Sequence, residues 1–307
     1  MPQSEPPHSP RFLAPRFWPT WVGLGLLRLS LLLPFPAMLW LGGRLGSLLY
    51  RLVGSRRSVT LTNLRLCFPE MAEAERQELA RASFVSAAIA LFEGVLSWWG
   101  SDSRLKPLYR IEGLEHLEAA RRSGNGVILL GGHYTTLEIS GRFLAYHVGG
   151  LQPIYKPAKN ALFEAIMASS RKRLFDDLVP SSDMRRIVRN LKQNKVMWYA
   201  PDQDFGRKQS VFAPFFGVPT ATLTTTARLA RLSGAPVVPY YSERLPGKEG
   251  YRVRLLPALE GFPSGDDLAD ATLTNQVLEA QIQRIPEQYL WLHKRFKTRP
   301  PGENSVY

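Results

Sequence analysis

The residues best suited to chemistry lie in residues 126–138, which read Gly-Val-Ile-Leu-Leu-Gly-Gly-His-Tyr-Thr-Thr-Leu-Glu. An apolar run at 127–130 is bounded by glycines and followed by an amphipathic segment. This pattern predicts a buried strand, a tight turn and a helix. His133 lies on the turn, and Glu138 follows five positions later. Residues five apart on a continuous helix point about 140° away from each other. A contact between these side chains therefore requires His133 to precede the regular helix.

A histidine at such a turn can act as a general base. A carboxylate on its second ring nitrogen fixes the tautomer and stabilises the imidazolium. The helix N-terminus adds backbone N–H groups that suit an anion or a developing oxyanion. No nucleophile adjoins the pair, because Ser140 lies further along the helix. The pair predicts deprotonation of a substrate hydroxyl. The competing interpretation is a loop histidine beside a solvated glutamate.

The composition limits the class of partner. The 307-residue chain carries 39 Lys and Arg against 26 Asp and Glu, a net charge of +13. This excess favours an acidic partner such as nucleic acid, anionic lipid or an acidic carrier protein, and the charge alone does not choose among them. The single cysteine, Cys67, excludes an internal disulfide and suits a reducing compartment. The five histidines have no zinc-ligand spacing, so no metal site is predicted.

The N-terminal third divides into three predicted parts. Residues 1–16 are rich in Pro and Ser and predict disorder. Residues 17–42 predict a single membrane anchor, since about 20 apolar residues cross a bilayer. Arg28 and Pro34 interrupt this stretch and leave open an interfacial helix that breaks near Pro34. More arginines follow the anchor than precede it, which predicts a single-pass protein with the remaining residues, 43–307, in the cytosol.

Strands and helices alternate in the remaining chain after a helical lead-in at 43–100. The predicted strands are 109–112, 127–130, 151–155, 196–200, 236–241 and 251–256. The predicted helices are 114–122, 135–147, 160–175, 183–194, 221–233 and 268–284. This order indicates an α/β fold with a mostly parallel sheet flanked by helices.

Three further stretches carry charge near predicted strand ends. Lys156 follows one strand, and Arg171 and Arg173 end the next helix; these cations could bind phosphate, or complement the helix dipole. The segment 200–207, with Asp202 and Asp204, directly follows a buried strand, where α/β proteins bind ligands.

The third stretch is a cationic stripe on the helix at 183–194, which could dock an anionic surface or be an ordinary solvated face. The stretch comprises Arg185, Arg186, Arg189, Lys192 and Lys195, of which positions 185, 189 and 192 fall on one helical face and form the stripe.

Taken in order, these motifs resemble the late acyltransferases of lipid A biosynthesis, the lauroyl/myristoyl transferase family. That family carries a His-x4-Asp/Glu motif, matched by His133 and Glu138. The resemblance covers nearly the whole chain, to about Arg299. It continues upstream at 63–70 and downstream through Tyr-Lys-Pro at 155–157, Trp-Tyr-Ala-Pro-Asp-Gln-Asp-Phe-Gly at 198–206, and the segments 211–217, 234–239 and 286–297. Lys156 stands where arginine is common in the family.

The resemblance implies a glycerolipid-acyltransferase-like fold at the bacterial inner membrane, with a cytoplasmic catalytic domain. The implied reaction transfers a fatty acyl chain, laurate or myristate, from acyl carrier protein to a hydroxyl of a Kdo-bearing lipid A precursor in lipopolysaccharide biosynthesis. No cofactor and no nucleic acid are implied. His133 would be the base and Glu138 its partner. Arg171, Arg173 and Lys156 would bind substrate, and Asp204 would organise the site.

Two alternatives remain at this stage. One is an acyltransferase that acts on another glycerophospholipid or glycolipid. The other is a non-enzymatic, membrane-tethered protein that binds anionic ligands. An acyl chain also needs a long apolar cleft, because each buried CH₂ contributes about 0.8 kcal/mol. The candidate walls are Trp198, Phe212, Phe215 and Phe216.

Overall fold

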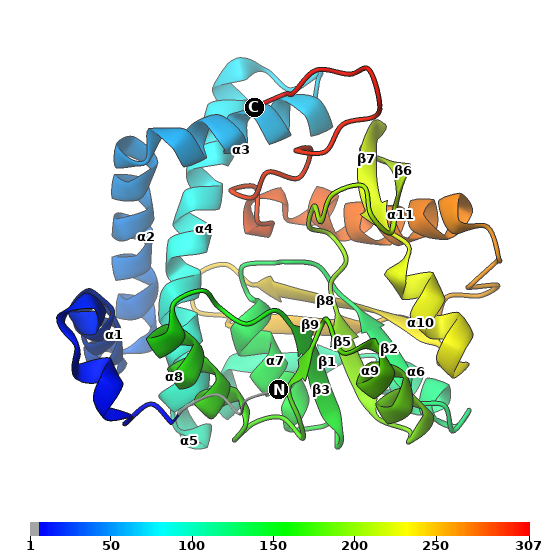
Figure 1. The fold of residues 1–307 in the computed structure, drawn as a ribbon. Helices are drawn as coiled ribbons and strands as arrows, with labels where there is room; N and C mark the ends of the chain where they lie inside the picture. Colours follow the sequence, from blue (N-terminus) through cyan, green and yellow to red (C-terminus); the bar gives the residue numbers. More distant parts are fainter. Residues whose placement is uncertain (1–5) are drawn as a thin grey trace.

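A seven-stranded sheet forms the centre of the computed structural model, which describes residues 6–307 (Figure 1). Its order is β1-β9-β8-β2-β5-β3-β4. The strands are β1 Tyr109–Glu112, β2 Val127–Leu130, β3 Leu151–Tyr155, β4 Val179–Pro180, β5 Val196–Tyr199, β8 Val237–Arg244 and β9 Tyr251–Leu255. All adjacent pairs are parallel except β8 and β9. The predicted α/β fold with a mostly parallel sheet is confirmed.

Helices cover both faces of this sheet, which is why the four residues of β2 are all buried. The helices are α6 Leu114–Arg121, α7 Leu137–Ala145, α8 Ala161–Arg171, α9 Met184–Lys192, α10 Thr225–Ser233 and α11 Asp267–Arg284. Residues of α6 and α7 share one core cluster with the sheet, and residues of α9 and α10 share another. The two clusters place these helix pairs on opposite faces.

The helical lead-in consists of α2 Phe35–Leu52, α3 Gly54–Cys67 and α4 Glu73–Trp99. Helix α4 runs along the side of the sheet and packs closely against α2 (Figure 1). Gly46 allows this approach, because a Cβ atom there would lie 2.4 Å from Cα of Val85. The predicted lead-in at 43–100 is thus helical.

The N-terminal segment differs from its prediction in two ways. Residues 10–17 form short 3₁₀ helices, Pro10–Leu13 and Pro15–Phe17, and buried Phe12 packs in the core, so predicted disorder does not hold there. Residues 1–5 of that prediction lie outside the described residues. The apolar stretch is divided into α1 Trp18–Leu29 and α2, because Leu33 is extended before Pro34.

A single helix spanning 17–42 is therefore not formed. Helix α1 has 12 residues, about 18 Å at 1.5 Å per residue, against a hydrocarbon core of about 30 Å. Within residues 6–307, the helix long and apolar enough to span a membrane is α4, and 56% of its most apolar window is buried inside the protein. The break near Pro34 is the one that the alternative, an interfacial helix, predicted, and the contact of this helix with a membrane stays a prediction.

A hairpin of β6 Ser210–Phe215 and β7 Val218–Leu223 replaces the first part of the predicted helix 221–233. Its two-residue turn, Phe216-Gly217, has positive φ at both positions, 49° and 75°. This backbone geometry is typical of the tight turns that join antiparallel strands. Helix α10 begins only at Thr225, after the hairpin.

Candidate active site

The register of two parallel strands brings His133 beside Asp202. Strands β2 and β5 are neighbours, with Leu130 opposite Tyr199. His133 lies three residues after the end of β2, and Asp202 lies three residues after the end of β5. Nδ1 of His133 donates to Oδ1 of Asp202 at 2.6 Å, and the His133 backbone N–H donates to Oδ2 at 2.9 Å. The carboxylate thus holds both the ring and the main chain of the histidine.

Electrostatics couple the two groups. Burial of Asp202, whose side chain is 1% exposed, raises the pKa of this carboxyl, but the charge and hydrogen bonds of His133 outweigh it and lower the pKa to about 2. For His133, burial lowers the pKa, while the charge and hydrogen bond of Asp202 raise it further, so the net pKa lies above its ordinary value. The result is an oriented, more basic imidazole.

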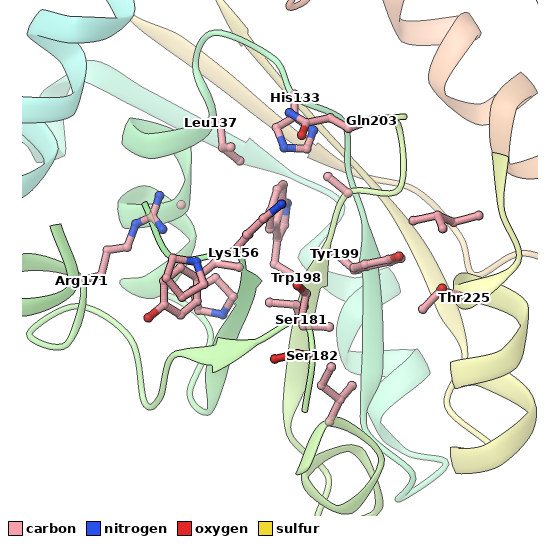
Figure 2. Close-up of a pocket in the computed structure, with 18 of the residues that line it drawn as sticks. His133, Leu137, Lys156, Arg171, Ser181, Ser182, Trp198, Tyr199, Gln203 and Thr225 are labelled. Carbon is pink, nitrogen blue, oxygen red and sulfur yellow. The ribbon is translucent and has the colours of Figure 1, made fainter. Parts of the chain in front are cut away.

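The second ring nitrogen of His133 is available to a substrate. Within residues 6–307, no side chain or backbone group is hydrogen-bonded to Nε2, and the His133 side chain is 26% exposed. With the proton on Nδ1, Nε2 carries a lone pair that can accept a proton. Figure 2 shows the imidazole at the edge of a pocket, beside Gln203.

The structure corrects the predicted contact between His133 and Glu138. Glu138 lies in the first turn of α7, and its carboxylate accepts hydrogen bonds from Arg171 Nε at 3.0 Å, Arg171 Nη2 at 2.5 Å and Trp98 Nε1 at 2.5 Å. Its pKa is lowered: burial raises it, but the Arg171 charge and these bonds outweigh burial. The carboxylate that orients His133 is Asp202 because Glu138 is directed toward α8 and α4.

Arg171 lines the same pocket as His133 and Glu138. Its predicted role was to bind substrate phosphate. However, its Nε and Nη2 atoms donate hydrogen bonds to the Glu138 carboxylate, and its side chain is 16% exposed. The pair is therefore a bidentate, mostly buried ion pair in the pocket wall. Arg171 therefore forms part of the pocket wall, and the Glu138 carboxylate compensates most of its charge.

The other predicted substrate-binding residues are dispersed. Lys156 is exposed on the pocket wall, with Nζ 5.9 Å from the centre of the Phe205 ring. Exposed Arg173 donates to the carbonyl of Trp98 at 3.1 Å and is not part of the described pocket wall. The three predicted cations therefore do not form one cluster.

Asp204 lies outside the pocket wall, and its hydrogen bonds connect two segments of the chain. Its carboxylate accepts hydrogen bonds from the Gly206 backbone at 2.8 Å and from the Thr298 backbone and hydroxyl at 2.6 and 2.8 Å. Its own backbone N–H donates to Nε2 of His293 at 3.2 Å. Asp204 thus ties the loop after β5 to the C-terminal segment.

The pocket beside His133 has a volume of about 910 Å³ (Figure 2). This volume is at the upper end of the range of ligand pockets, and large enough for a long aliphatic chain. Apolar side chains form much of its wall, and they come from the central sheet, from α7 to α10, from β7 and from the loop after α8: Leu137, Leu144, Leu151, Ile154, Met167, Phe175, Met184, Ile187, Trp198, Leu223 and Leu229.

Of the four aromatic residues predicted for this wall, Trp198 is confirmed. The predictions for Phe212, Phe215 and Phe216 are wrong, because none of them lines the pocket. Phe215 is fully buried in a separate cluster with Phe296. The hairpin of β6 and β7 places Phe215 and Phe216 in the cluster formed with α11 and the C-terminal segment.

The turn that carries His133 is held by backbone bonds to a distant segment. The Thr135 N–H donates to the Gln288 carbonyl at 2.8 Å, and the Leu290 N–H donates to the His133 carbonyl at 3.2 Å. The Gln288 side chain bonds both the backbone N–H and the carbonyl of Arg244, at 2.7 and 2.9 Å. Residues 286–290 therefore join the His133 turn to the end of β8.

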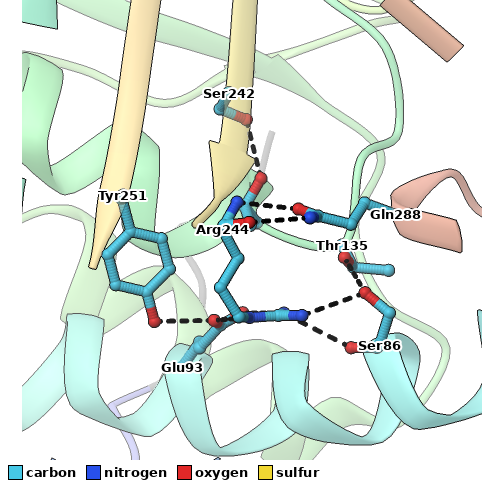
Figure 3. A network of polar contacts seen from close by, with 8 residues as sticks. Ser86, Glu93, Thr135, Ser242, Arg244, Tyr251 and Gln288 are labelled. Atoms are coloured by element: carbon cyan, nitrogen blue, oxygen red, sulfur yellow. Dashed lines mark hydrogen bonds and ion pairs between the residues drawn. The ribbon is translucent and has the colours of Figure 1, made fainter. Parts of the chain in front are cut away.

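A buried ion pair supports this junction (Figure 3). Arg244 donates to the two carboxylate oxygens of Glu93, from Nε at 2.6 Å and Nη2 at 2.8 Å, and Tyr251 donates to Glu93 at 2.6 Å. Arg244 also donates to the Ser86 hydroxyl at 3.1 Å, which lies 2.7 Å from the Thr135 hydroxyl. Helix α4 is thus bonded to the turn that carries His133 through a polar network.

Sequence reasoning missed Asp202 as the partner of His133, although it singled out the segment that contains it. The available signal was position: Asp202 and His133 each follow a buried strand at the same distance. The roles of Glu93 and Arg244 had no local signal, because these residues are 151 positions apart in the chain.

Comparison with known proteins shows the family of the chain. Residues 5–298 match the bacterial lipid A biosynthesis acyltransferase family, to which the chain belongs. It is 41% identical over 303 residues to the lipid A biosynthesis palmitoleoyltransferase of Escherichia coli K12, covering 97% of each chain. It is 38% identical to the lauroyltransferase of the same strain, over 98% of this chain and 99% of that one. Identity to the myristoyltransferase is 29%, over 98% and 94%.

Proposed function

We propose that the protein transfers a fatty acyl chain from acyl carrier protein to a hydroxyl of a Kdo-bearing lipid A precursor. The observation that carries this proposal is the His133–Asp202 pair at the edge of a large, mainly apolar pocket. The family supports lipid A acylation. The relatives are named for palmitoleoyl, lauroyl and myristoyl transfer. Within this range of acyl chains, we propose that this protein transfers laurate or myristate.

In the proposed mechanism, Nε2 of His133 removes the proton from the acceptor hydroxyl. The resulting alkoxide attacks the thioester carbonyl, forms the ester bond and expels the carrier thiolate. His133 then returns the proton to the thiolate, so that the products are an ester and a free thiol. Asp202 holds the proton on Nδ1 and stabilises the imidazolium during transfer. No acyl-enzyme forms.

The acyl chain would occupy the apolar wall between α7, α8 and α9. There Gly141 leaves space beside Phe175, because a Cβ on Gly141 would lie 3.3 Å from Cζ of that ring. The Glu138–Arg171 pair faces the same space and would position the acceptor. Lys156 would contact an anionic group of either substrate at the exposed edge. Arg173 is a weaker candidate because it lies outside the pocket wall.

Association with the inner membrane on its cytoplasmic side is part of this proposal. Trp18, Val22, Leu26 and Leu29 recur at helical spacing on α1 and are each about 60% exposed. On the opposite side, Leu24 packs α1 against α8 and the residues near the pocket. An apolar face beside the pocket suits an enzyme whose acceptor is a membrane glycolipid.

The two alternatives are less well supported. An acyltransferase with another glycolipid or glycerophospholipid acceptor would use the same base, but the family favours lipid A. A binding protein without activity would not require a buried carboxylate that raises the basicity of a pocket histidine.

The test is an assay of the purified protein with acyl carrier protein loaded with 12-, 14- or 16-carbon chains and a Kdo-bearing lipid A precursor. The expected product is the precursor with one added acyl group, identified by mass. His133→Ala should abolish transfer while the protein remains folded. Near-normal turnover by folded His133→Ala protein would contradict the mechanism, and transfer only to a glycerophospholipid would favour the first alternative.

A further inference from the structure

A second concavity, of about 550 Å³, lies between α9 and α10 on the outer surface of the protein. We call it the α9–α10 groove. Its apolar floor consists of Met184, Val188 and Leu232, and the Leu232 side chain is 48% exposed. Arg185, Arg189, Lys192 and Arg228 surround this floor, with Gln193 completing the wall. The groove thus combines an apolar centre with a cationic rim.

The rim charges are uncompensated. Arg185, Arg189, Lys192 and Arg228 are all exposed, and in residues 6–307 none of them has an ion pair or a side-chain hydrogen bond. Neighbouring cations differ, because Arg186 pairs with Asp177 and Arg231 pairs with Asp267. No carboxylate belongs to the described wall of the groove. Four like charges around one depression favour an anionic partner.

The groove is separated from the acyl pocket by one helix. Met184 lines both cavities, and Ile187 on the next turn of α9 lines the acyl pocket. A partner seated on the outer face of α9 would therefore lie one helix diameter, about 10 Å, from the space proposed for the acyl chain. A flexible thioester-bearing arm could span this distance.

We propose that the α9–α10 groove docks the acidic carrier protein that delivers the acyl thioester. This inference rests on the proposed function and adds the surface through which the donor is recognised. An acidic helix would pair its carboxylates with the rim, and its apolar side chains would contact Met184, Val188 and Leu232. Such an arrangement provides electrostatic steering together with a small desolvated centre.

The position of the groove favours a soluble protein, rather than the membrane surface, as its partner. The exposed apolar face of the N-terminal segment belongs to α1 and α2, which lie at one end of the molecule, whereas α10 lies at the other (Figure 1). A bilayer bound to α1 and α2 leaves the groove accessible from the cytosol. The two substrates would then approach the pocket from different sides.

The test compares two double charge reversals. Arg185→Glu/Arg228→Glu changes one cation on each wall of the groove. Arg185 lies in the first turn of α9, where an acidic residue suits the helix dipole. The matched control, Arg110→Glu/Arg122→Glu, makes the same change in net charge at exposed residues on β1 and after α6. Binding of holo-acyl carrier protein is measured by titration, and KM is measured with acyl carrier protein and with a carrier-free acyl-pantetheine thioester.

The groove variant should weaken carrier binding and raise KM for the carrier-linked donor by at least about tenfold at low salt. It should leave transfer from acyl-pantetheine unchanged, and the control should match the unmodified protein. Equal carrier binding by both variants would overturn the docking site. Loss of binding to anionic vesicles with unchanged carrier binding would assign the groove to lipid and also overturn it. If the unmodified protein transfers no acyl group from either donor, the proposed function fails, while the titration still decides the docking site.

Discussion

Replacing Asp202 with asparagine tests the reassigned partner of His133 most directly. The carboxylate accepts two hydrogen bonds from His133, one from Nδ1 and one from the backbone N–H. These bonds go to different carboxylate oxygens, so asparagine, with a single carbonyl oxygen, cannot accept both in this geometry. If its oxygen keeps the backbone bond, its NH₂ group faces Nδ1 and moves the ring proton to Nε2. The nitrogen needed as base is then already protonated.

The expected loss in kcat is about 10³- to 10⁴-fold, the effect of the wrong tautomer in a histidine–carboxylate pair, or about 4–5.5 kcal/mol of activation free energy. The pH dependence supplies a second readout. His133 must be neutral to act as base, so activity falls as the pH falls through its pKa. Asp202 raises that pKa, whereas burial lowers it. Asp202→Asn should therefore move the acid limb of the pH profile to lower pH.

Two controls distinguish this role from general disruption. Asp204→Asn changes a neighbouring carboxylate that bonds Thr298, so the acid limb should stay in place. Glu138→Gln removes the partner of Arg171 and should reduce activity and stability, again without moving the acid limb. An unshifted limb in folded Asp202→Asn protein, or a shifted limb in Glu138→Gln, would refute the assignment of Asp202.

Three further changes test other parts of the structure. Glu93→Ala leaves Arg244, whose side chain is only 10% exposed, without its ion-pair partner and should lower the free energy of unfolding by about 3–5 kcal/mol, measured by urea denaturation; an unchanged midpoint contradicts this role. Gly141→Val narrows the pocket beside Phe175 and should shift donor preference toward shorter chains in the acyl-transfer assay, whereas an equal loss with every donor would argue against an acyl site there. Leu26→Asp places a charge on the exposed face of α1 and should reduce sedimentation with phospholipid vesicles; full retention would refute that face as a membrane contact.

Local sequence was sufficient for much of the framework. The apolar run at 127–130, bounded by glycines, predicted β2, and the polar turn after it placed His133 at the strand end. The alternation of such strands with amphipathic helices predicted a mostly parallel sheet. Pro34 also carried a local signal, because the residue before proline avoids the helical region. The apolar length of 17–42 favoured one helix, but that backbone restriction divided it into two.

Only the tertiary structure decided which carboxylate serves His133. The spacing of five residues suggested Glu138, and the family motif includes it, but the first turn of α7 directs its side chain to Arg171. Asp202 is 69 positions away in the chain. It becomes adjacent because β5 follows β2 in the sheet, with Leu130 opposite Tyr199. Helix and strand periodicity is set by neighbouring residues and can be read along the chain, whereas the order and register of strands depend on how the whole core packs.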